Sequence, residues 1–304
     1  MKYEDWLAVW LESYVRPSAK ARTYERYASL IRLHIAPRLG AYDADGLTPA
    51  VLQSFAASLS AGGNLRADGG LSPNTVSVAL SVVKNSLRAA RLAGVVQTSP
   101  AEHLVHPRRT ERPVECFTLA EQKKIERAAL SYKKEKMRGV VLCLYTGLRL
   151  GELLALTWAD VDLKKGVLTV AASCHDGRGG RVTEAPKTPS SRRVIPLPKQ
   201  LLPLLRAWKK GSASPCLVAE DGNPVSVRSY QRSFQLLLRR LHIPHRGFHA
   251  LRHTFATRAL ECGMDVKTLS EILGHKNATV TLNRYAHSLL EHKASMMNRL
   301  GKLL

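Results

Sequence analysis

The feature that most constrains the fold is a basic stretch without periodicity at residues 106–113. It reads His-Pro-Arg-Arg-Thr-Glu-Arg-Pro and has a proline near each end. Because proline lacks a backbone N–H and fixes its own φ angle, neither a helix nor a strand continues readily through such a sequence. A chain of 304 residues is long enough for two hydrophobic cores. We therefore expect two domains, residues 1–105 and 116–304, joined by a linker at 106–115.

The first part has the pattern of a small helical bundle. Apolar residues recur at helical spacing in four segments, at 3–15, 22–36, 49–60 and 73–93. Thr48-Pro49 and Ser72-Pro73 each join a capping residue to a proline, which is typical of a helix start. Pro37-Arg-Leu-Gly40, a helix breaker followed by a C-terminal glycine, predicts the end of the second helix. The faces opposite the apolar stripes are basic, so they are either solvated surface or a surface that binds an anion.

The second part combines helices with a few short strands. Helices are predicted at 119–131, 134–146, 198–209, 226–241, 249–263 and 265–273. Strands are predicted at 167–172, 180–184 and 192–196, with a glycine-rich hairpin turn at 176–180 after the first of them. Lys187 would project from the next turn, between Pro186 and Pro189. The expected fold class is mainly α with a small antiparallel β-sheet, an α+β fold.

The charge of the chain predicts a polyanionic partner. Lys and Arg number 46 against 24 Asp and Glu, which gives a net charge of +22. Nucleic acid is the first candidate and an anionic membrane surface the second, but no apolar run approaches the roughly 20 residues of a spanning helix. A generally basic protein without such a partner is the remaining alternative.

The five scattered cysteines form no CxxC pair, which argues against a disulfide framework or a zinc site and favours a reducing compartment. The N-terminus, Met-Lys-Tyr-Glu-Asp-Trp, does not have the pattern of a secretory signal. We therefore expect a cytoplasmic, nucleoid-associated protein.

The segment 248–285 gathers groups that suit a phosphodiester. Arginine and histidine side chains can donate hydrogen bonds to its non-bridging oxygens, and Tyr285 offers an oxygen nucleophile. Further upstream, Arg149 lies between two apolar helices and Lys187 in a hairpin turn. Each of these two has a plain structural alternative: Arg149 could tie loop carbonyls together or pair with Glu152, and Lys187 could be solvated surface.

Five segments in order resemble the tyrosine recombinase (phage integrase) family. They are Thr-Gly-Leu-Arg-Leu-Gly-Glu at 146–152, Lys-Thr-Pro-Ser-Ser-Arg-Arg at 187–193, His-Ala-Leu-Arg-His-Thr-Phe-Ala-Thr at 249–257, Leu-Gly-His at 273–275 and Asn-Arg-Tyr-Ala-His at 283–287. The resemblance covers nearly the whole chain. The part before the linker is similar to the family's SAM-like core-site DNA-binding domain, and the part after it to the family's catalytic domain.

The resemblance and the chemistry of the side chains together imply a catalytic set: Arg149, Lys187, His249, Arg252, His275 and Tyr285. The two arginines and His275 would bind the non-bridging oxygens. Tyr285 would be the nucleophile, with His249 as its acid/base, and Lys187 would give a proton to the leaving 5′-oxygen. These cations would replace the paired magnesium ions of other phosphoryl transfers, so no cofactor is expected.

His249 and His253 also have the i, i+4 spacing of a zinc protease, but Ala250 stands where that motif needs glutamate. Arg252 beside them would repel a metal ion, and we expect no metal site. His253 is instead expected either to contact and hold the catalytic side chains without touching DNA, or to belong to the hydrophobic core. Glu152 is expected to orient Arg149.

DNA contacts are expected from eight residues on basic faces: Arg22, Thr23, Arg26, Asn74, Lys84, Arg88, Arg228 and Arg232. The resemblance implies double-stranded DNA with specific core sites as the substrate, and a homo-tetramer on DNA that is a monomer or weak oligomer when free. Accessory DNA-bending or excision factors would be further partners. The apolar tail 289–304 resembles a helix that docks on a neighbouring protomer; packing on its own domain is the alternative.

These features predict a site-specific DNA recombinase that works through a 3′-phosphotyrosyl intermediate, as the integrase of a prophage or conjugative transposon. A chromosome-dimer resolvase, a type IB topoisomerase and a DNA-binding regulator without catalysis are the alternatives. Integrases often carry an additional N-terminal domain for arm sites, whereas this sequence starts at the core-binding part. The subtype therefore stays open.

Overall fold

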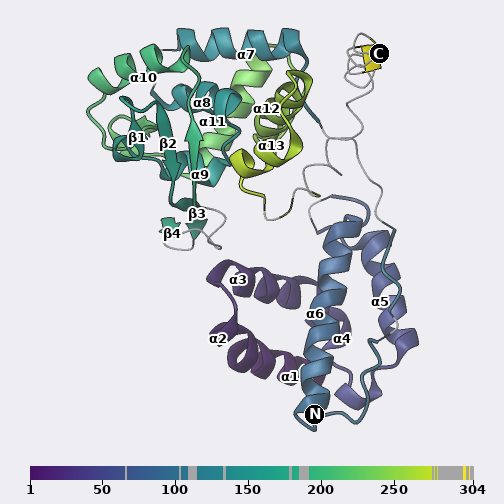
Figure 1. The fold of residues 1–304 in the computed structure, drawn as a ribbon. Coiled ribbons are helices and arrows are strands. Elements are labelled where there is room, and N and C mark those ends of the chain that lie inside the picture. The colour runs from purple at the N-terminus through teal and green to yellow at the C-terminus, as the bar shows by residue number, and fades with distance from the viewer. Residues whose placement is uncertain are drawn as a thin grey trace. The chain divides into compact units, whose positions relative to one another are not determined.

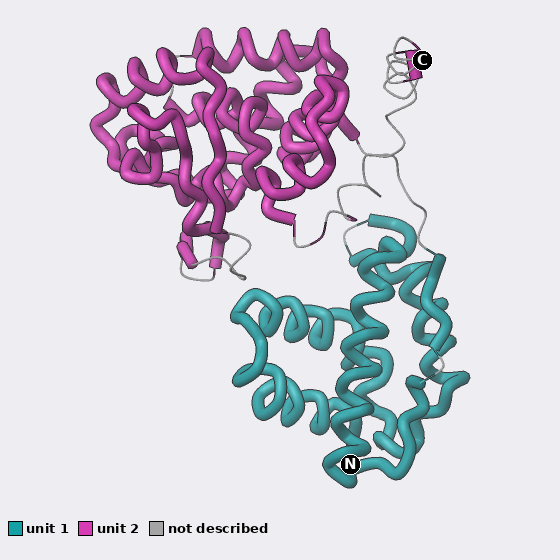
Figure 2. The backbone as a smooth tube through the Cα atoms, viewed as in Figure 1, with its two compact units in different colours: residues 1–112 teal, residues 113–304 magenta. Residues whose placement is uncertain are grey.

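The chain forms two compact units, residues 1–112 and residues 113–304, each with its own hydrophobic core (Figure 2). The division falls inside the stretch 106–115 that was expected to be a linker. The computed structural model describes residues 1–65, 67–102, 104–108, 115–132, 135–177, 180–184 and 192–275, and residues 277, 279, 297, 298 and 301.

The described part of unit 1 is helical. Its elements are α1 (Tyr3–Trp10), a π-helical segment (Leu11–Val15), α2 (Arg16–Ser18), α3 (Ala21–Leu30), a second π-helical segment (Ile31–Ile35), α4 (Ala36–Leu39), α5 (Pro49–Gly62) and α6 (Pro73–Leu92), with a short 3₁₀ turn at Ala44–Gly46 (Figure 1). Two aromatic side chains of α1 join it to α6: the hydroxyl of Tyr3 lies 2.6 Å from that of Ser86, and the indole N–H of Trp6 donates to the Ser86 carbonyl at 2.9 Å.

The two helix starts that the sequence predicts in unit 1 are confirmed. The side chain of Thr48 accepts a hydrogen bond from the backbone N–H of Val51, and that of Ser72 accepts one from Thr75. Both satisfy N–H groups that the first turn of a helix leaves without a partner.

The helix that was predicted to end over Pro37–Gly40 does end at Gly40, but the proline itself does not break it. The helical path continues through this proline to Leu39, because a π-helical segment precedes it. Pro17 follows the other π-helical segment in the same way. A proline ring clashes with the carbonyl four residues earlier in a regular α-helix. The wider π turn shifts that carbonyl, and each proline then lies in the first turn of a new helical segment, where its missing N–H costs little.

Unit 2 is built around the buried helix α8 (Arg138–Thr146), where Val140, Val141 and Leu142 are fully buried. The other helices described are α7 (Leu119–Ser131), α9 (Leu150–Ala155), α10 (Leu201–Lys210), α11 (Val227–Arg240), α12 (His249–Glu261) and α13 (Val266–Leu273), with 3₁₀ turns at Glu135–Met137 and Trp158–Asp160 (Figure 1). Helix α12 packs against α8 and α13.

The described strands form three small antiparallel sheets. Strands β1 (Val161–Asp162), β2 (Val167–Val170) and β5 (Arg193–Pro196) form one; β3 (Ser173–Gly177) pairs with β4 (Gly180–Glu184), and β6 (Ala219–Glu220) with β7 (Asn223–Pro224). The predicted single strand 167–172 running into the hairpin is therefore wrong: β2 pairs with β5, and the hairpin is made by the separate strand β3. The reason is burial. Leu168 pairs with Ile195 across β2 and β5, both in the core, and the chain leaves this sheet after Val170.

The β3–β4 hairpin (Figure 1) is anchored to the body of unit 2 through Asp176 and Arg181, which pair with each other next to its turn. The Asp176 carboxylate accepts the backbone N–H groups of Val227 and Arg228 at the start of α11, both at 2.9 Å. The Arg181 guanidinium donates to the Leu154 carbonyl at the end of α9. Gly151 lets α9 approach β3, because a Cβ there would lie 2.5 Å from the Cys174 carbonyl oxygen.

Candidate active site

Arg149 is held at the N-terminus of α9 by a glutamate one turn later. Gly147 ends α8 with φ +64°, a left-handed conformation that favours glycine, and the chain turns at once into α9. The Glu152 carboxylate accepts the backbone N–H of Arg149 at 2.9 Å and its Nη1 at 2.7 Å. The Arg149 side chain keeps 36% of its surface exposed, whereas that of Glu152 keeps only 6%. The arginine is thus fixed on one side and open on the other.

A second arginine binds the same carboxylate from strand β5. Arg193 donates from Nη1 to Glu152 Oε1 at 3.0 Å and from Nη2 to Oε2 at 2.8 Å, a bidentate pair that is buried on both sides. Burial by itself would raise the pKa of Glu152, but the hydrogen bonds and charge of Arg193, followed by those of Arg149, lower that pKa to about 2. Glu152 is therefore ionised at neutral pH.

Arg252 lies on α12 and is almost fully buried, with 1% of its surface exposed. Its Nη1 donates to the Gly147 carbonyl at 2.9 Å, its Nη2 donates to the Leu273 carbonyl at 2.6 Å, and Nη2 also lies 2.9 Å from His275 Nε2. Because a guanidinium can only donate, His275 accepts through Nε2 in this arrangement. The proton of the neutral imidazole then resides on Nδ1.

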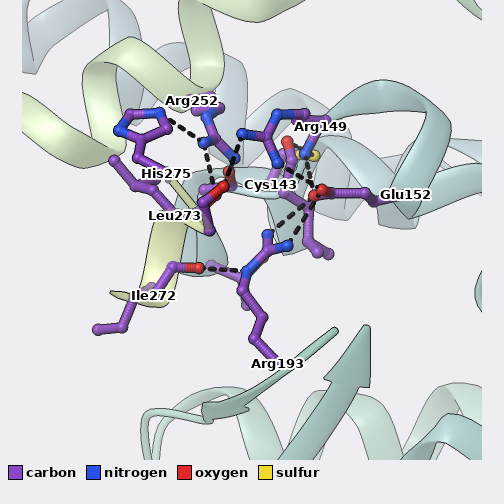
Figure 3. Close-up of polar contacts among 12 residues, drawn as sticks. Cys143, Arg149, Glu152, Arg193, Arg252, Ile272, Leu273 and His275 are labelled. Atoms are coloured by element: carbon purple, nitrogen blue, oxygen red, sulfur yellow. Dashed lines mark hydrogen bonds and ion pairs between the residues drawn. The ribbon is translucent and has the colours of Figure 1, made fainter. Parts of the chain in front are cut away.

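Three arginines from three elements converge on the C-terminus of α13 (Figure 3). The last carbonyls of a helix have no partner within it, and they form the negative end of the helix dipole. Here three consecutive carbonyls each accept from a different guanidinium: Ile272 from Arg193 Nε at 2.5 Å, Leu273 from Arg252 Nη2 at 2.6 Å, and Gly274 from Arg149 Nη2 at 3.1 Å. We call Arg149, Arg193, Arg252 and Glu152 the arginine cluster.

His275 follows directly after this helix end. Gly274 has φ +64°, its N–H donates to the Glu271 carbonyl, and the N–H of His275 donates back to the Ser270 carbonyl at 3.0 Å. These two bonds form a Schellman motif, which fixes the direction in which the chain leaves the helix. A Cβ on Gly274 would also lie 2.9 Å from Arg193 Nη1. The glycine is therefore needed both for its backbone conformation and for the close approach of Arg193.

The remaining predicted residues of the site lie in two groups. His249 is the first residue of α12, exposed, one turn before Arg252, and its ring packs edge-on against that of His253 with centroids 4.6 Å apart. His253 is buried. Lys187 and Tyr285 lie outside the described residues, as does the tail 289–304 apart from residues 297, 298 and 301. The structure thus brings together Arg149, Arg252, His275 and Glu152, with His249 at the neighbouring turn of α12.

The predicted DNA-contact residues lie on three helices. Seven of the eight are exposed and Thr23 is partly buried: Arg22, Thr23 and Arg26 on α3, Asn74, Lys84 and Arg88 on α6, and Arg228 and Arg232 on α11. Lys84 donates to the Glu102 carbonyl at 3.4 Å. Their contacts with DNA stay predictions.

The sequence analysis missed Arg193. The strand 193–196 alternates strictly: Arg193 and Ile195 are buried, and Val194 and Pro196 are exposed. This alternation could have predicted a buried ion pair, because an arginine on the same face as a core isoleucine needs a buried hydrogen-bond acceptor.

Within the described residues, no three His, Cys, Asp or Glu side chains are grouped so that they could hold a metal ion. The helices in the same part of the chain are all too short or too polar to cross a membrane.

Two family models match this chain. The phage integrase family matches residues 117–292, and the phage integrase N-terminal SAM-like domain matches residues 2–60. A protein named tyrosine recombinase XerC-like, from Caldanaerobacter subterraneus subsp. tengcongensis, is 28% identical over 98% of this chain and 82% of its own length.

Solved structures give the same assignment for the fold. A structure of residues 82–397 of the Tn1549 transposon integrase, in complex with transposon right end DNA, superimposes with a TM-score of 0.83 at 25% identity, over 99% of this chain and 100% of that segment. A lambda integrase tetramer bound to a Holliday junction gives a TM-score of 0.73 at 21% identity, over 92% and 79% of the two chains. With the family models, these likenesses place the protein in the phage integrase family, and it is a site-specific DNA recombinase of the tyrosine type.

Proposed function

We propose that this recombinase cleaves and rejoins double-stranded DNA at specific core sites through a 3′-phosphotyrosyl bond at Tyr285, and that it is the integrase of a mobile element. The observation that carries the proposal is the convergence of Arg149, Arg252 and His275 at one helix end, with Arg149 open on one side. A phosphodiester needs such an arrangement, since its transition state carries negative charge on the non-bridging oxygens.

Two guanidinium groups held in place by other protein groups can stabilise that charge without rearranging during the reaction. Arg252 is fixed by its bonds to the Gly147 and Leu273 carbonyls, and Arg149 by Glu152. His275 would supply a further donor to the same oxygens after its ring has left Arg252 and presents a protonated nitrogen to them. This change at His275 would precede the chemical step, whereas the two guanidinium groups would stay in place.

The chemical step requires a nucleophile, a base and an acid. The hydroxyl of tyrosine has an ordinary pKa of about 10 and needs help to lose its proton near neutral pH. We assign that role to His249 and the attack on phosphorus to Tyr285. The bond from phosphorus to the 5′-oxygen breaks, and Lys187 gives that oxygen a proton. The reverse reaction with a 5′-hydroxyl from a second duplex exchanges the strands.

The assembly we propose is a homo-tetramer on DNA that is a monomer or weak oligomer when free. The lambda integrase tetramer on a Holliday junction supports this proposal by its fold. Residues 1–105 would bind the core site, 106–115 would link the parts, and 116–304 would carry out catalysis. The tail 289–304 would dock on the neighbouring protomer, and accessory DNA-bending or excision factors would direct the reaction in the bacterial cytoplasm, at the nucleoid.

The choice of a mobile-element integrase is supported by the likeness to the Tn1549 integrase over the whole chain. The XerC-like relative supports a chromosome-dimer resolvase as the alternative. The DNA that flanks the gene separates the two. Attachment repeats at both ends of an element would support the integrase, and flanking DNA without such repeats would support the resolvase.

The test uses a nicked suicide duplex made from the flanking attachment sequence, from which the cleaved strand end diffuses away. We expect the wild type to become covalently joined to the DNA. Tyr285→Phe should bind the duplex with unchanged affinity but form no covalent complex. Tyr42→Phe, at an exposed tyrosine of unit 1, is the matched control and should react like the wild type.

Two outcomes would contradict the proposal. Binding without covalent linkage by the wild type would favour a DNA-binding regulator. Linkage accompanied by relaxation of supercoils, but with no recombination between two sites, would favour a type IB topoisomerase.

A further inference from the structure

We propose that Arg193 is a positioning residue for strand cleavage. Its guanidinium joins β5, the start of α9 and the end of α13, and so fixes the positions of Arg149 and His275 relative to each other. This inference rests on the proposed function and deepens it. Arg193 is not assigned to the catalytic set, because its guanidinium is buried and binds protein groups of unit 2.

All three nitrogens of the Arg193 guanidinium are engaged. Nη1 and Nη2 bind the two oxygens of Glu152, and Nε binds the Ile272 carbonyl. The planar fork therefore spans two elements that are far apart in the sequence, with the carboxylate on one edge and the helix end on the other (Figure 3). A lysine could not reproduce this geometry, because its ammonium is a single point with rotatable donors.

Both groups that Arg193 binds hold a proposed catalytic residue. Glu152 accepts from the backbone and side chain of Arg149. Ile272 lies in the last turn of α13, directly before the Schellman motif that fixes His275. Arg149 itself closes the ring by donating to the Gly274 carbonyl. Movement of α13 relative to α9 would thus displace His275 from Arg149, and Arg193 opposes that movement.

The packing of Gly274 against Arg193 is an independent sign that this contact is close. A Cβ added at Gly274 would lie within 3.2 Å of three atoms of the Arg193 side chain. In the sequence, Arg193 stands six positions after Lys187 and is the first residue of β5, so the segment that contains the proposed acid leads into this anchor.

A buried ion pair could also serve stability alone, and the two roles predict different pH profiles. The charged and titratable groups that act on Glu152 are Arg149 at the start of its own helix and Arg193 on β5; Cys143 on α8 interacts with both Glu152 and Arg252 on α12. Without Arg193, burial would dominate and the pKa of Glu152 would rise. Protonation of Glu152 would then release Arg149, so cleavage would fall as the pH falls.

The experiment compares the single-turnover rate of cleavage of the nicked duplex for Arg193→Gln, Arg193→Lys and the control Arg206→Gln. Arg206 is exposed on α10, and its substitution removes the same charge from the same unit. We expect Arg193→Gln to cleave on the order of 100-fold more slowly than the wild type at neutral pH, because displacing catalytic groups by about 1 Å has effects of that size. DNA affinity should stay within about threefold of the wild type, because the Arg193 side chain is buried, with only 6% of its surface exposed.

The pH profile distinguishes positioning from stability. Between about pH 5 and about pH 9 the Arg193→Gln rate should rise more steeply with pH than the wild-type rate. Adding Glu152→Gln should remove that extra dependence, because the titrating group is gone. Arg193→Lys keeps a charge near Glu152, so it should be slower than the wild type with the wild-type profile; it also serves as the second variant if Arg193→Gln does not fold.

A second readout does not depend on catalysis. In protein labelled at the histidine rings, the imidazole signals of His275, identified with His275→Asn, should shift in Arg193→Gln and Arg193→Lys but not in Arg206→Gln. If the wild type forms no covalent complex, the proposed function fails while this spectrum still tests the link from Arg193 to His275.

The inference is overturned if the His275 signals do not move. It is equally overturned if both Arg193 variants cleave like the wild type, or if Arg193→Gln loses cleavage only in proportion to its unfolded fraction and keeps the wild-type pH profile.

Discussion

At the residue scale, Glu152 links protonation to the geometry of the arginine cluster. Its carboxylate is buried and binds Arg149 and Arg193 together, and these contacts lower its pKa from an ordinary 4.5 to about 2. A carboxyl group with a depressed pKa in the folded state stabilises that state above its unfolded pKa, and this stabilisation disappears as the pH falls through the folded pKa. The stabilisation by the Glu152 carboxylate is therefore lost as the pH falls from about 4.5 to about 2.

We predict that Glu152→Gln lowers the free energy of unfolding of unit 2 at pH 7 by roughly 3 kcal/mol, because the pKa shift corresponds to that amount. The difference from the wild type should shrink as the pH falls from about 4.5 toward 2, where the wild-type carboxyl also becomes protonated. Denaturant unfolding at several pH values measures this. The control Glu261→Gln changes a more exposed i, i+3 pair with Arg258, and a difference for Glu152→Gln that stays constant with pH would contradict the prediction.

Sequence reasoning identified Arg149, Arg252, His275 and Glu152, and the structure brings these four together. It missed Arg193 because the partner of that residue lies 41 positions away on a different element. A motif shows which side chains suit a chemistry, but a single sequence does not show which acid a buried arginine will reach. Lys187 and Tyr285 stay predictions.

At the scale of elements, the hairpin β3–β4 is tied to α11 by one carboxylate. Asp176 accepts two backbone N–H groups at the start of α11, the helix that carries Arg228 and Arg232. If this helix contacts DNA as predicted, the hairpin and the DNA-binding face would move together. The side chain that couples them, Asp176, is exposed and is not part of the hydrophobic core.

We predict that Asp176→Ala lowers the stability of this contact by about 1 kcal/mol, the usual cost of losing a helix cap. Amide hydrogen exchange should become faster in β3, β4 and the first turn of α11. Asp265→Ala is a matched control, because Asp265 caps α13 through Thr268 in the same local way. Equal protection of the hairpin in both variants would refute the coupling.

Helix starts were predictable from the sequence because a capping side chain and its N–H partner are three residues apart, as in Thr48, Ser72 and Thr118. The pairing of strands was not predictable from the sequence. Strand β2 pairs with β5 and not with β3, which is nearer in the sequence, because of contacts that form only in the folded core. The helix ends at Gly40, as its glycine predicts, but Pro37 does not break it for a local reason: a π turn upstream removes the clash.

At the scale of the whole molecule, the net charge of +22 should control binding to DNA. Each phosphate contact releases counterions, so affinity falls steeply with salt. Exposed arginines on α11 and basic residues on α3 and α6 supply candidates in both units.

We predict a loss of affinity on the order of 10³-fold or more between about 50 mM and 200 mM salt, measured by fluorescence anisotropy on a core-site duplex. The double variant Arg228→Gln/Arg232→Gln should reduce the slope of log affinity against log salt by about two, one for each contact. Arg206→Gln/Lys210→Gln on α10 removes the same charge and should leave the slope unchanged. A DNA affinity that hardly varies with salt concentration would contradict the predicted phosphate contacts.

The meeting of three guanidinium groups and one carboxylate at the end of α13 has a consequence for charge balance. The four side chains of the arginine cluster carry a formal charge of about +2 at neutral pH. A phosphodiester carries about one negative charge, and the same group under attack by a phenolate carries about two. If the cluster binds the phosphodiester as proposed, Glu152 would reduce the charge of the cluster to match that of the transition state. The bound DNA would then be attracted less strongly than the state that the enzyme must stabilise.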